Sequence, residues 1–181
     1  MFSKEKYCLI PRLLSVEIAN YLFDYVVERA SHGELSTDSR VPTAFSAYGD
    51  PVMEGILELL CPIISHHCEC TLLPTYSYYR VYGNGDFLPR HRDREACEIT
   101  ASLNLGQKPG DIWPLWLAKD NGNFPAMLGP GDALIYRGGE YDHWRDPFMG
   151  ETAAQVFFHF VDANGPFALW KFDKRKSLNT L

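Results

Sequence analysis

The spacing of apolar residues near the start of the chain follows a helical period. Ile18, Leu22 and Val26 recur every four residues and would form one apolar stripe on a helix. Ser15 precedes this stripe, and serine is a favoured cap for the first turn of a helix. The pattern therefore predicts a helix from Ser15 to about Ala30.

A second helical stretch begins at Asp50-Pro51. Aspartate is a good helix cap, and proline fits the first helical position because its missing N–H would have no partner there. Leu60 and Ile64 lie on the apolar face of this stretch. Pro62 lies inside it and should kink the helix or split it in two, because proline removes an internal hydrogen bond.

From about Leu73 the period changes to alternation. Tyr76, Tyr78, Arg80 and Tyr82 would share one face of a strand, because successive side chains point to opposite faces. Turn signals such as Gly83-Asn84-Gly85 then separate several shorter strand candidates. These candidates are residues 87–91, 98–105, 113–117, 133–136, 154–161 and 168–172. Many short strands at this spacing predict a sandwich or a barrel.

The 181 residues are expected to form a single domain, 1–181. Residues 1–72 would be a helical support and residues 73–181 the β core, so the predicted class is mainly β with N-terminal helices (α+β). Hydrophobic residues make up 46% of the chain and aromatic residues 14%. This composition supplies enough apolar material for a core and excludes a disordered chain.

The formal net charge of −6 argues against a nucleic-acid partner and against a membrane-surface protein. No stretch reaches the ~20 apolar residues of a transmembrane helix. Pro11 and Arg12 interrupt the first apolar run, so we expect no signal peptide. The five cysteines are an odd set without a disulfide-framework spacing, which predicts a reduced, cytoplasmic protein.

The sequence His91-Arg92-Asp93 ends one of the strand-like runs. Residues two apart on a strand point to the same side, so the imidazole and the carboxylate can converge on one point. A third ligand from a distant segment would complete a 2-His-1-carboxylate site for non-haem Fe(II). The motif alone is common by chance, and a surface cluster of charges with neighbours such as Arg90 and Arg94 is the alternative interpretation.

The context of this motif is more specific than the motif itself. Tyr82-Gly83 precedes it and Leu103-Asn104 follows it; further on come a Pro-Gly-Asp hairpin at 130–132, His143 and a final apolar strand. In this order the pieces resemble the prolyl-4-hydroxylase-like branch of the 2-oxoglutarate/Fe(II) oxygenases. The resemblance covers about Ser77 to Asp162. It implies a double-stranded β-helix, a jelly-roll or cupin-like barrel.

The resemblance also implies an activity and a ligand set. The activity would be hydroxylation of an unactivated C–H with Fe(II), with 2-oxoglutarate as cosubstrate and with O2. His91, Asp93 and His143 would hold the iron. His159, on the last apolar strand, is the rival for the distal position, although we favour a pocket-lining role for it.

The sequence departs from the family pattern at one position. Members of the family typically carry an Arg or Lys about nine or ten residues after the distal histidine, to pair with the 5-carboxylate of 2-oxoglutarate. Here those positions are Thr152 and Ala153. A buried carboxylate needs a cationic or multiply donating partner. The residues expected to bind the cosubstrate instead are Tyr82, Arg80, Ser102 and Gln155, and Thr100, Arg137 and Arg145 are further candidates for the partner of its 5-carboxylate.

The substrate is less defined than the metal. Tyr78, Trp144 and Arg145 are candidates for binding it, and it could be a small molecule, an amino acid or a peptidyl residue such as proline. The oligomeric state stays open. Because no Arg or Lys stands nine or ten residues after His143, a second function remains an alternative. The protein would then be a cupin-type metal-binding barrel, either an isomerase or a ligand-binding module, that does not use 2-oxoglutarate.

Overall fold

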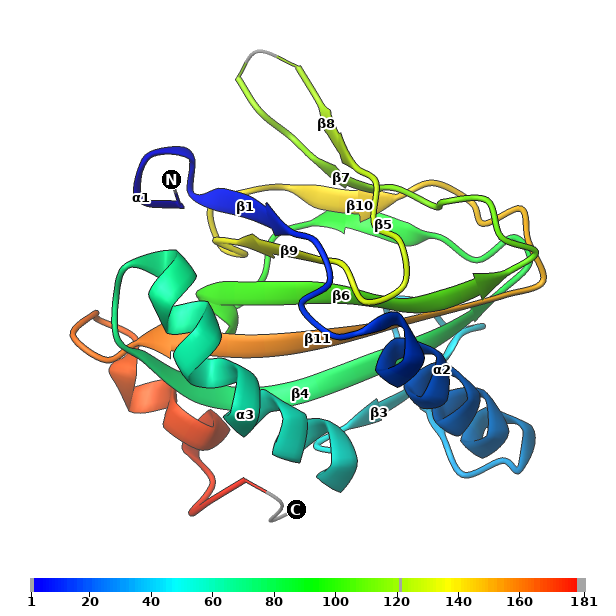
Figure 1. The fold of residues 1–181 in the computed structure, drawn as a ribbon, viewed down its shortest axis with the longest axis horizontal. Coiled ribbons are helices and arrows are strands. Elements are labelled where there is room, and N and C mark those ends of the chain that lie inside the picture. Colours follow the sequence, from blue (N-terminus) through cyan, green and yellow to red (C-terminus); the bar gives the residue numbers. More distant parts are fainter. Residues whose placement is uncertain (1, 121, 179–181) are drawn as a thin grey trace.

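The computed structural model describes residues 2–120 and 122–178. Two antiparallel sheets face each other (Figure 1). The larger has the order β1-β9-β6-β11-β4-β3-β2 and the smaller the order β5-β10-β7-β8. The strands are β1 (Tyr7–Ile10), β2 (Ser36–Thr37), β3 (Phe45–Tyr48), β4 (Leu72–Gly83), β5 (Leu88–His91), β6 (Ile99–Lys108), β7 (Leu115–Leu117), β8 (Phe124–Ala126), β9 (Ala133–Tyr136), β10 (His143–Arg145) and β11 (Thr152–Asp162).

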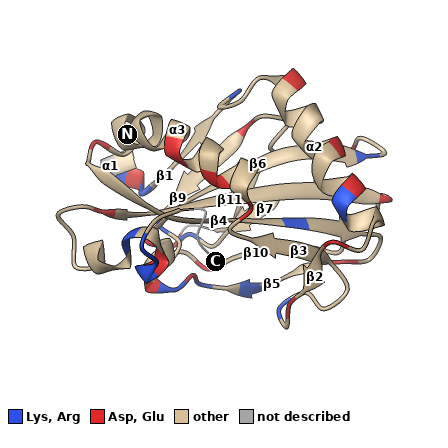
Figure 2. Cartoon of the chain, turned by 90° about the horizontal axis from the view of Figure 1, so that it is seen from below, with Lys and Arg blue, Asp and Glu red and all other residues tan. Residues whose placement is uncertain are grey.

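The helices lie mainly on one side of the larger sheet. They are α1 (Phe2–Glu5), α2 (Val16–Ser31) and α3 (Pro51–Cys68), with 3-10 segments η1 (Glu95–Cys97) and η2 (Ala168–Lys174). Seen from below, α2 and α3 cover one face of this sheet, and β5 and β10 lie beyond its other face (Figure 2). The order of layers is therefore helices, larger sheet, smaller sheet.

The local signals for α2 and α3 are confirmed. The Ser15 hydroxyl accepts a hydrogen bond from the N–H of Ile18 at 3.3 Å, and the Asp50 carboxylate accepts from Val52 and Met53. The helix α3 runs through Pro62 as a single element, so the predicted split is wrong.

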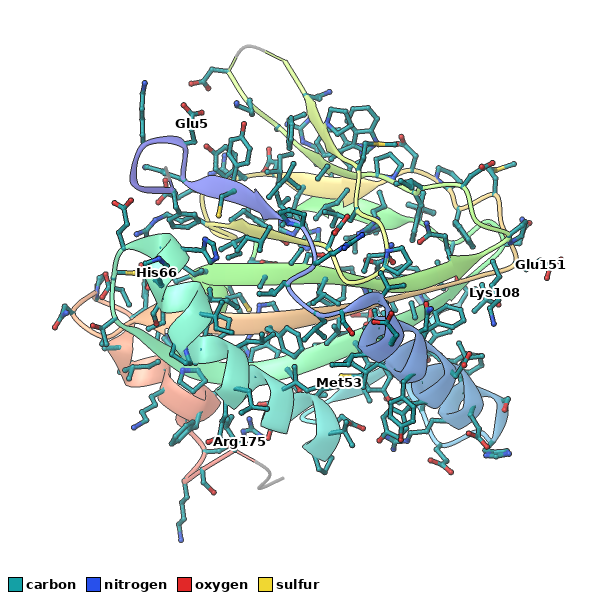
Figure 3. All side chains as sticks on the ribbon, viewed as in Figure 1. Glu5, Met53, His66, Lys108, Glu151 and Arg175 are labelled. Atoms are coloured by element: carbon teal, nitrogen blue, oxygen red, sulfur yellow. The ribbon has the colours of Figure 1, made fainter. Side chains whose placement is uncertain are left out.

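The predicted alternation along β4 divides the interior into two cores. Tyr79 and Val81 pack in the core between the larger sheet and the helices, which includes Met53 of α3 (Figure 3). Tyr78 and Arg80 face the space between the two sheets. β4 pairs with β11 and β3 inside the larger sheet, and packed residues lie on both of its faces.

Two expectations about the elements are corrected. The first 72 residues are not only helical: β1 pairs with β9, and β3 pairs with β4, so this segment adds strands to the larger sheet. Residues 168–172 are part of η2 rather than a strand. Phe172 and Asp173 there have positive φ, which interrupts an extended backbone.

None of the helices described combines the length and the apolar character that crossing a membrane requires.

Candidate metal centre

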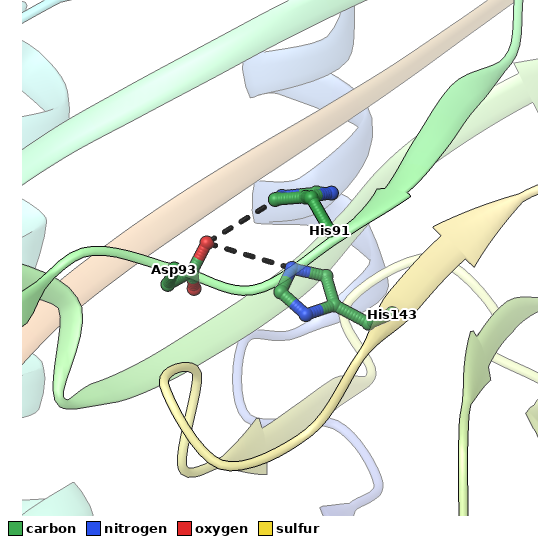
Figure 4. A group of neighbouring side chains, drawn as sticks. All are labelled: His91, Asp93 and His143. Carbon is green, nitrogen blue, oxygen red and sulfur yellow. Dashed lines mark ion pairs between the residues drawn. The ribbon is translucent and has the colours of Figure 1, made fainter.

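Three side chains converge between the two sheets (Figure 4). His91 ends β5, and His143 begins β10 directly opposite it in the antiparallel pair. Asp93 lies two residues beyond His91. The Nε2 atoms of His91 and His143 are each 3.5 Å from Oδ1 of Asp93. Strand pairing therefore brings together two histidines that are 52 positions apart in the sequence.

Backbone carbonyls fix both imidazole rings. Nδ1 of His91 is 2.8 Å from the carbonyl oxygen of Pro89, and Nδ1 of His143 is 3.1 Å from that of Tyr141. A carbonyl only accepts, so each Nδ1 carries a hydrogen, and each Nε2 is the ring nitrogen that would bind a metal ion. Two imidazole nitrogens and one carboxylate oxygen form a donor set that fits Fe(II).

Hydrogen bonds fix Asp93 on the side away from the two histidines. Thr100 Oγ1 donates to Oδ2 at 2.9 Å, and the backbone N–H of Asp93 donates to the carbonyl of Gly138. Burial on its own would raise the pKa of Asp93. The hydrogen bonds from His143 and His91 outweigh burial and hold the pKa well below its usual range. The group is therefore an anion in the folded protein.

His159 lies next to this group and forms a second cluster with Asp93 and Cys97. Its Nδ1 is 3.0 Å from Thr100 Oγ1. Burial lowers the pKa of His159 to about 4 and raises the pKa of the Cys97 thiol, so both side chains are neutral near pH 7. A neutral thiol is a poor metal ligand, so this second cluster offers fewer good ligands than His91, Asp93 and His143 do.

A cavity of about 440 Å³ opens beside the three residues. Tyr76, Tyr78 and Phe157 form an aromatic wall, while Tyr136 lies next to the His143 ring with the centroids 4.9 Å apart. His91, Asp93, His143 and His159 all line the same cavity. A ligand bound in it would contact the metal-ligand candidates directly.

Arg80 lines the cavity, but its charge is already paired. Its side chain is 5% exposed and forms an ion pair with Asp38, which also accepts a hydrogen bond from the Tyr78 hydroxyl. The other oxygen of Asp38 accepts from the N–H groups of Arg40 and Val41. This carboxylate joins the loop after β2 to the wall of the cavity.

The other residues expected to bind the cosubstrate lie outside the cavity lining. Tyr82, Ser102 and Gln155 are buried between the sheets. The side chain of Gln155 donates to Asn104 at 2.9 Å and accepts from Arg145 at 3.1 Å, so both ends of its amide are engaged. Ser102 Oγ has no hydrogen-bond partner among the described residues.

Arg145 and Trp144, two of the residues expected to bind substrate, lie on opposite sides of β10. Arg145 is 1% exposed and lies on the same side as His143. Trp144 lies on the opposite side, half-buried, where it stacks on Trp116 with the centroids 6.1 Å apart. Neither Trp144 nor Arg145 is among the residues that line the cavity, and alternation along the strand points Trp144 away from it.

No protein-family profile and no curated protein sequence matches the chain. Solved structures do match it. A Pseudomonas putida prolyl-4-hydroxylase has a TM-score of 0.74 at 18% identity, with 89% of this chain and 95% of that chain covered. A Trichoplax adhaerens prolyl hydroxylase, in complex with a hypoxia inducible factor oxygen degradation domain peptide fragment, has a TM-score of 0.73 at 16% identity, with 88% and 85% covered.

The epimerase SnoN, in complex with Fe3+, alpha ketoglutarate and nogalamycin RO, has a TM-score of 0.73 at 10% identity, with 99% of this chain and 89% of that chain covered. The chain has the double-stranded β-helix fold of these enzymes. The expected fold class is thereby confirmed, although its two sheets stay separate rather than closing into a barrel.

Sequence reasoning missed three residues around the site. Asp38 lies in a polar loop, and nothing in its neighbourhood distinguishes it from a solvated acid. Gly138 is one of many glycines, yet a Cβ there would lie 2.3 Å from Oδ2 of Asp93. Tyr136 ends an apolar strand candidate, which is a position typical of core packing. Only the pairing of β9 with β6 brings these last two near Asp93.

Proposed function

We propose that this protein is an Fe(II)- and 2-oxoglutarate-dependent oxygenase. The observation that carries the proposal is the convergence of two imidazole Nε2 atoms and one carboxylate oxygen at the wall of a cavity. The fold shared with two prolyl hydroxylases and an alpha ketoglutarate-binding epimerase supports it. The metal ligands would be His91, Asp93 and His143, a 2-His-1-carboxylate donor set of the kind that holds non-haem Fe(II).

The bound iron would supply the oxidising chemistry, with 2-oxoglutarate and O2 as cosubstrates and succinate and CO2 as products. The chain's own residues would orient and shield it. The carbonyls of Pro89 and Tyr141 hold the two imidazoles, and Thr100 holds the carboxylate. The aromatic wall of Tyr76, Tyr78 and Phe157 would exclude water from the reacting C–H.

The reaction we propose is hydroxylation of a small molecule, an amino acid or a peptidyl residue. Tyr78 would contact the substrate, because it lines the same cavity as the metal-ligand candidates. The peptide bound by the Trichoplax enzyme makes a prolyl peptide a reasonable first substrate to assay. The complex of SnoN with nogalamycin RO makes a small molecule of that kind the second.

The test is release of succinate from 2-oxoglutarate in the presence of Fe(II) and air, over a panel of amino acids, proline-containing peptides and small molecules related to nogalamycin. We expect at least one compound to stimulate succinate release by the wild type and none to stimulate the Asp93→Ala variant. The cupin-type alternative predicts that Fe(II) binds with the same three ligands while no compound yields succinate. That second result would overturn the proposal.

A further inference from the structure

Two arginines are buried between the sheets, and only one of them has a counter-ion among the described residues. Arg80 is 5% exposed and forms an ion pair with Asp38. Arg145 is 1% exposed, and no carboxylate of residues 2–120 and 122–178 lies within ion-pair distance of it. A buried cation without an anion is costly, so its retention calls for an explanation.

The hydrogen bonds of Arg145 go to neutral acceptors. One terminal nitrogen donates to the carbonyl of Trp113 at 2.5 Å and the other to Oε1 of Gln155 at 3.1 Å. Nε has no partner among the described residues. A guanidinium stays protonated near pH 7, so the side chain keeps its positive charge. The side chain is thus a buried cation whose Nε–H group makes no hydrogen bond with the described residues.

The hydroxyl of Ser102 is a second hydrogen-bond donor without a partner among the described residues, and it lies on β6 between Arg145 and the metal-ligand candidates. Thr100, Ser102 and Asn104 alternate along β6 and share the face toward the smaller sheet. Thr100 donates a hydrogen bond to Asp93, and Asn104 accepts one from Gln155. Ser102 Oγ is buried and has no partner in the described chain. Its hydroxyl therefore lies between the residues that hold the metal ligand and those that hold Arg145.

The spacing suits a short ligand with an anionic end. His143 and Arg145 are two residues apart on β10, which corresponds to roughly 6.6 Å along a strand. Tyr136 lines the cavity, and its ring lies next to that of His143.

We propose that Arg145 binds the distal carboxylate of 2-oxoglutarate, with the Ser102 hydroxyl as a second donor. The anchor would then come from the strand that carries His143, rather than from β11, where Thr152 and Ala153 carry no charge. Arg145 is a binding residue in this proposal, and Gln155 positions it. The inference rests on the proposed use of 2-oxoglutarate.

The test compares two 2-oxo acids of equal chain length, 2-oxoglutarate and 2-oxopentanoate, which differ in the distal carboxylate alone. Their affinities for the Fe(II)-loaded protein are measured anaerobically from the visible absorption band, without turnover. We expect the wild type to prefer 2-oxoglutarate by about 100-fold, and Arg145→Gln to reduce that preference to a few-fold while 2-oxopentanoate binds as before.

Two further variants complete the experiment. Arg80→Gln tests the competing anchor and should leave the preference at its wild-type value. Ser102→Ala should reduce the preference several-fold, and it serves as the decisive variant if Arg145→Gln does not fold. A wild-type preference that survives in both Arg145→Gln and Ser102→Ala, or that is lost in Arg80→Gln, would overturn the assignment. Failure of the proposed function looks different, because then neither 2-oxo acid produces a band in the wild type.

Discussion

The hydroxyl of Thr100 lies 2.9 Å from Oδ2 of Asp93 and donates its only proton to that carboxylate. Nδ1 of His159 lies 3.0 Å from the same hydroxyl and must therefore be the donor to it. One oxygen of Asp93 is fixed in this way, and Oδ1 is left facing the two histidines. The orientation of the metal-facing oxygen thus depends on a residue that is not itself a ligand.

Replacing Thr100 by valine should lower the affinity for Fe(II) by about tenfold, because the isosteric side chain no longer orients Asp93. Anaerobic competition with a chromogenic chelator measures this affinity. Thr75→Val is the matched control: Thr75 is equally buried, and its hydroxyl donates to the carbonyl of Ala96 at 2.8 Å instead. Equal losses in the two variants would show that the hydroxyl of Thr100 has no orienting role.

Gly138→Ala should displace the Asp93 carboxylate. The added Cβ would lie 2.3 Å from Oδ2 of Asp93 and 2.7 Å from the carbonyl oxygen of Cys97. We expect Fe(II) affinity to fall at least tenfold and the free energy of unfolding to fall by about 1–3 kcal/mol.

Gly139→Ala is the control for this change, because its nearest contact is Asp93 O at 3.8 Å, an ordinary van der Waals distance. Chelator competition and urea unfolding should give wild-type values for that variant. Wild-type iron affinity in Gly138→Ala would show that Asp93 does not need its present position.

The burial of neutral His159 should make stability depend on pH. Unfolded histidine binds a proton near pH 6.5, whereas burial lowers the folded pKa to about 4. Between these values the unfolded state binds more protons, so the free energy of unfolding falls as the pH falls, by about 3 kcal/mol in all. Above pH 6.5 this contribution is fully present.

Urea unfolding of the metal-free protein in chelator, from pH 7.5 to pH 4, measures the effect. Asp93, Arg94, His143 and Asp173 also act on this imidazole, so the informative quantity is the difference between wild type and His159→Gln. That difference should shrink as the pH falls. The exposed His67 provides the control, and a His67→Gln variant with the same pH-dependent difference would contradict the assignment.

Met53→Ala should destabilise the fold by about 2–5 kcal/mol without changing iron affinity. Met53 is a fully buried residue of α3, in the core between the helices and the larger sheet, and truncation leaves a cavity there. Urea unfolding with chelator competition on the folded protein separates the two quantities. Met149→Ala, at a residue 83% exposed, should change neither.

The sequence predicted those elements whose signals are local and long. Ser15 and Asp50 mark the starts of α2 and α3 because a capping side chain acts within one turn. The strand β4 was predicted because its 12 residues are long enough to show alternation. The strand β10 has three residues, too few for any period, so it is not among the strands that the sequence predicted.

The charge pairing in the interior could not be predicted for a different reason. Arg80 and Arg145 are both arginines at strand positions, and only the long-range pairing of strands shows that Asp38 reaches one of them and not the other. The same holds for Trp144, whose neighbours on β7 decide which side of the sheet it faces. Register between distant strands is set by the whole fold rather than by local spacing.

The central claim is that His91, Asp93 and His143 form one metal site that accepts 2-oxoglutarate beside the metal. Anaerobic addition of Fe(II) and then 2-oxoglutarate, followed by visible absorption, tests it most directly. We predict a metal-to-ligand charge-transfer band that saturates at one iron per chain in the wild type and in His159→Ala, and is lost in His143→Ala. A wild type without the band, or a His143→Ala variant that retains it, would contradict the claim.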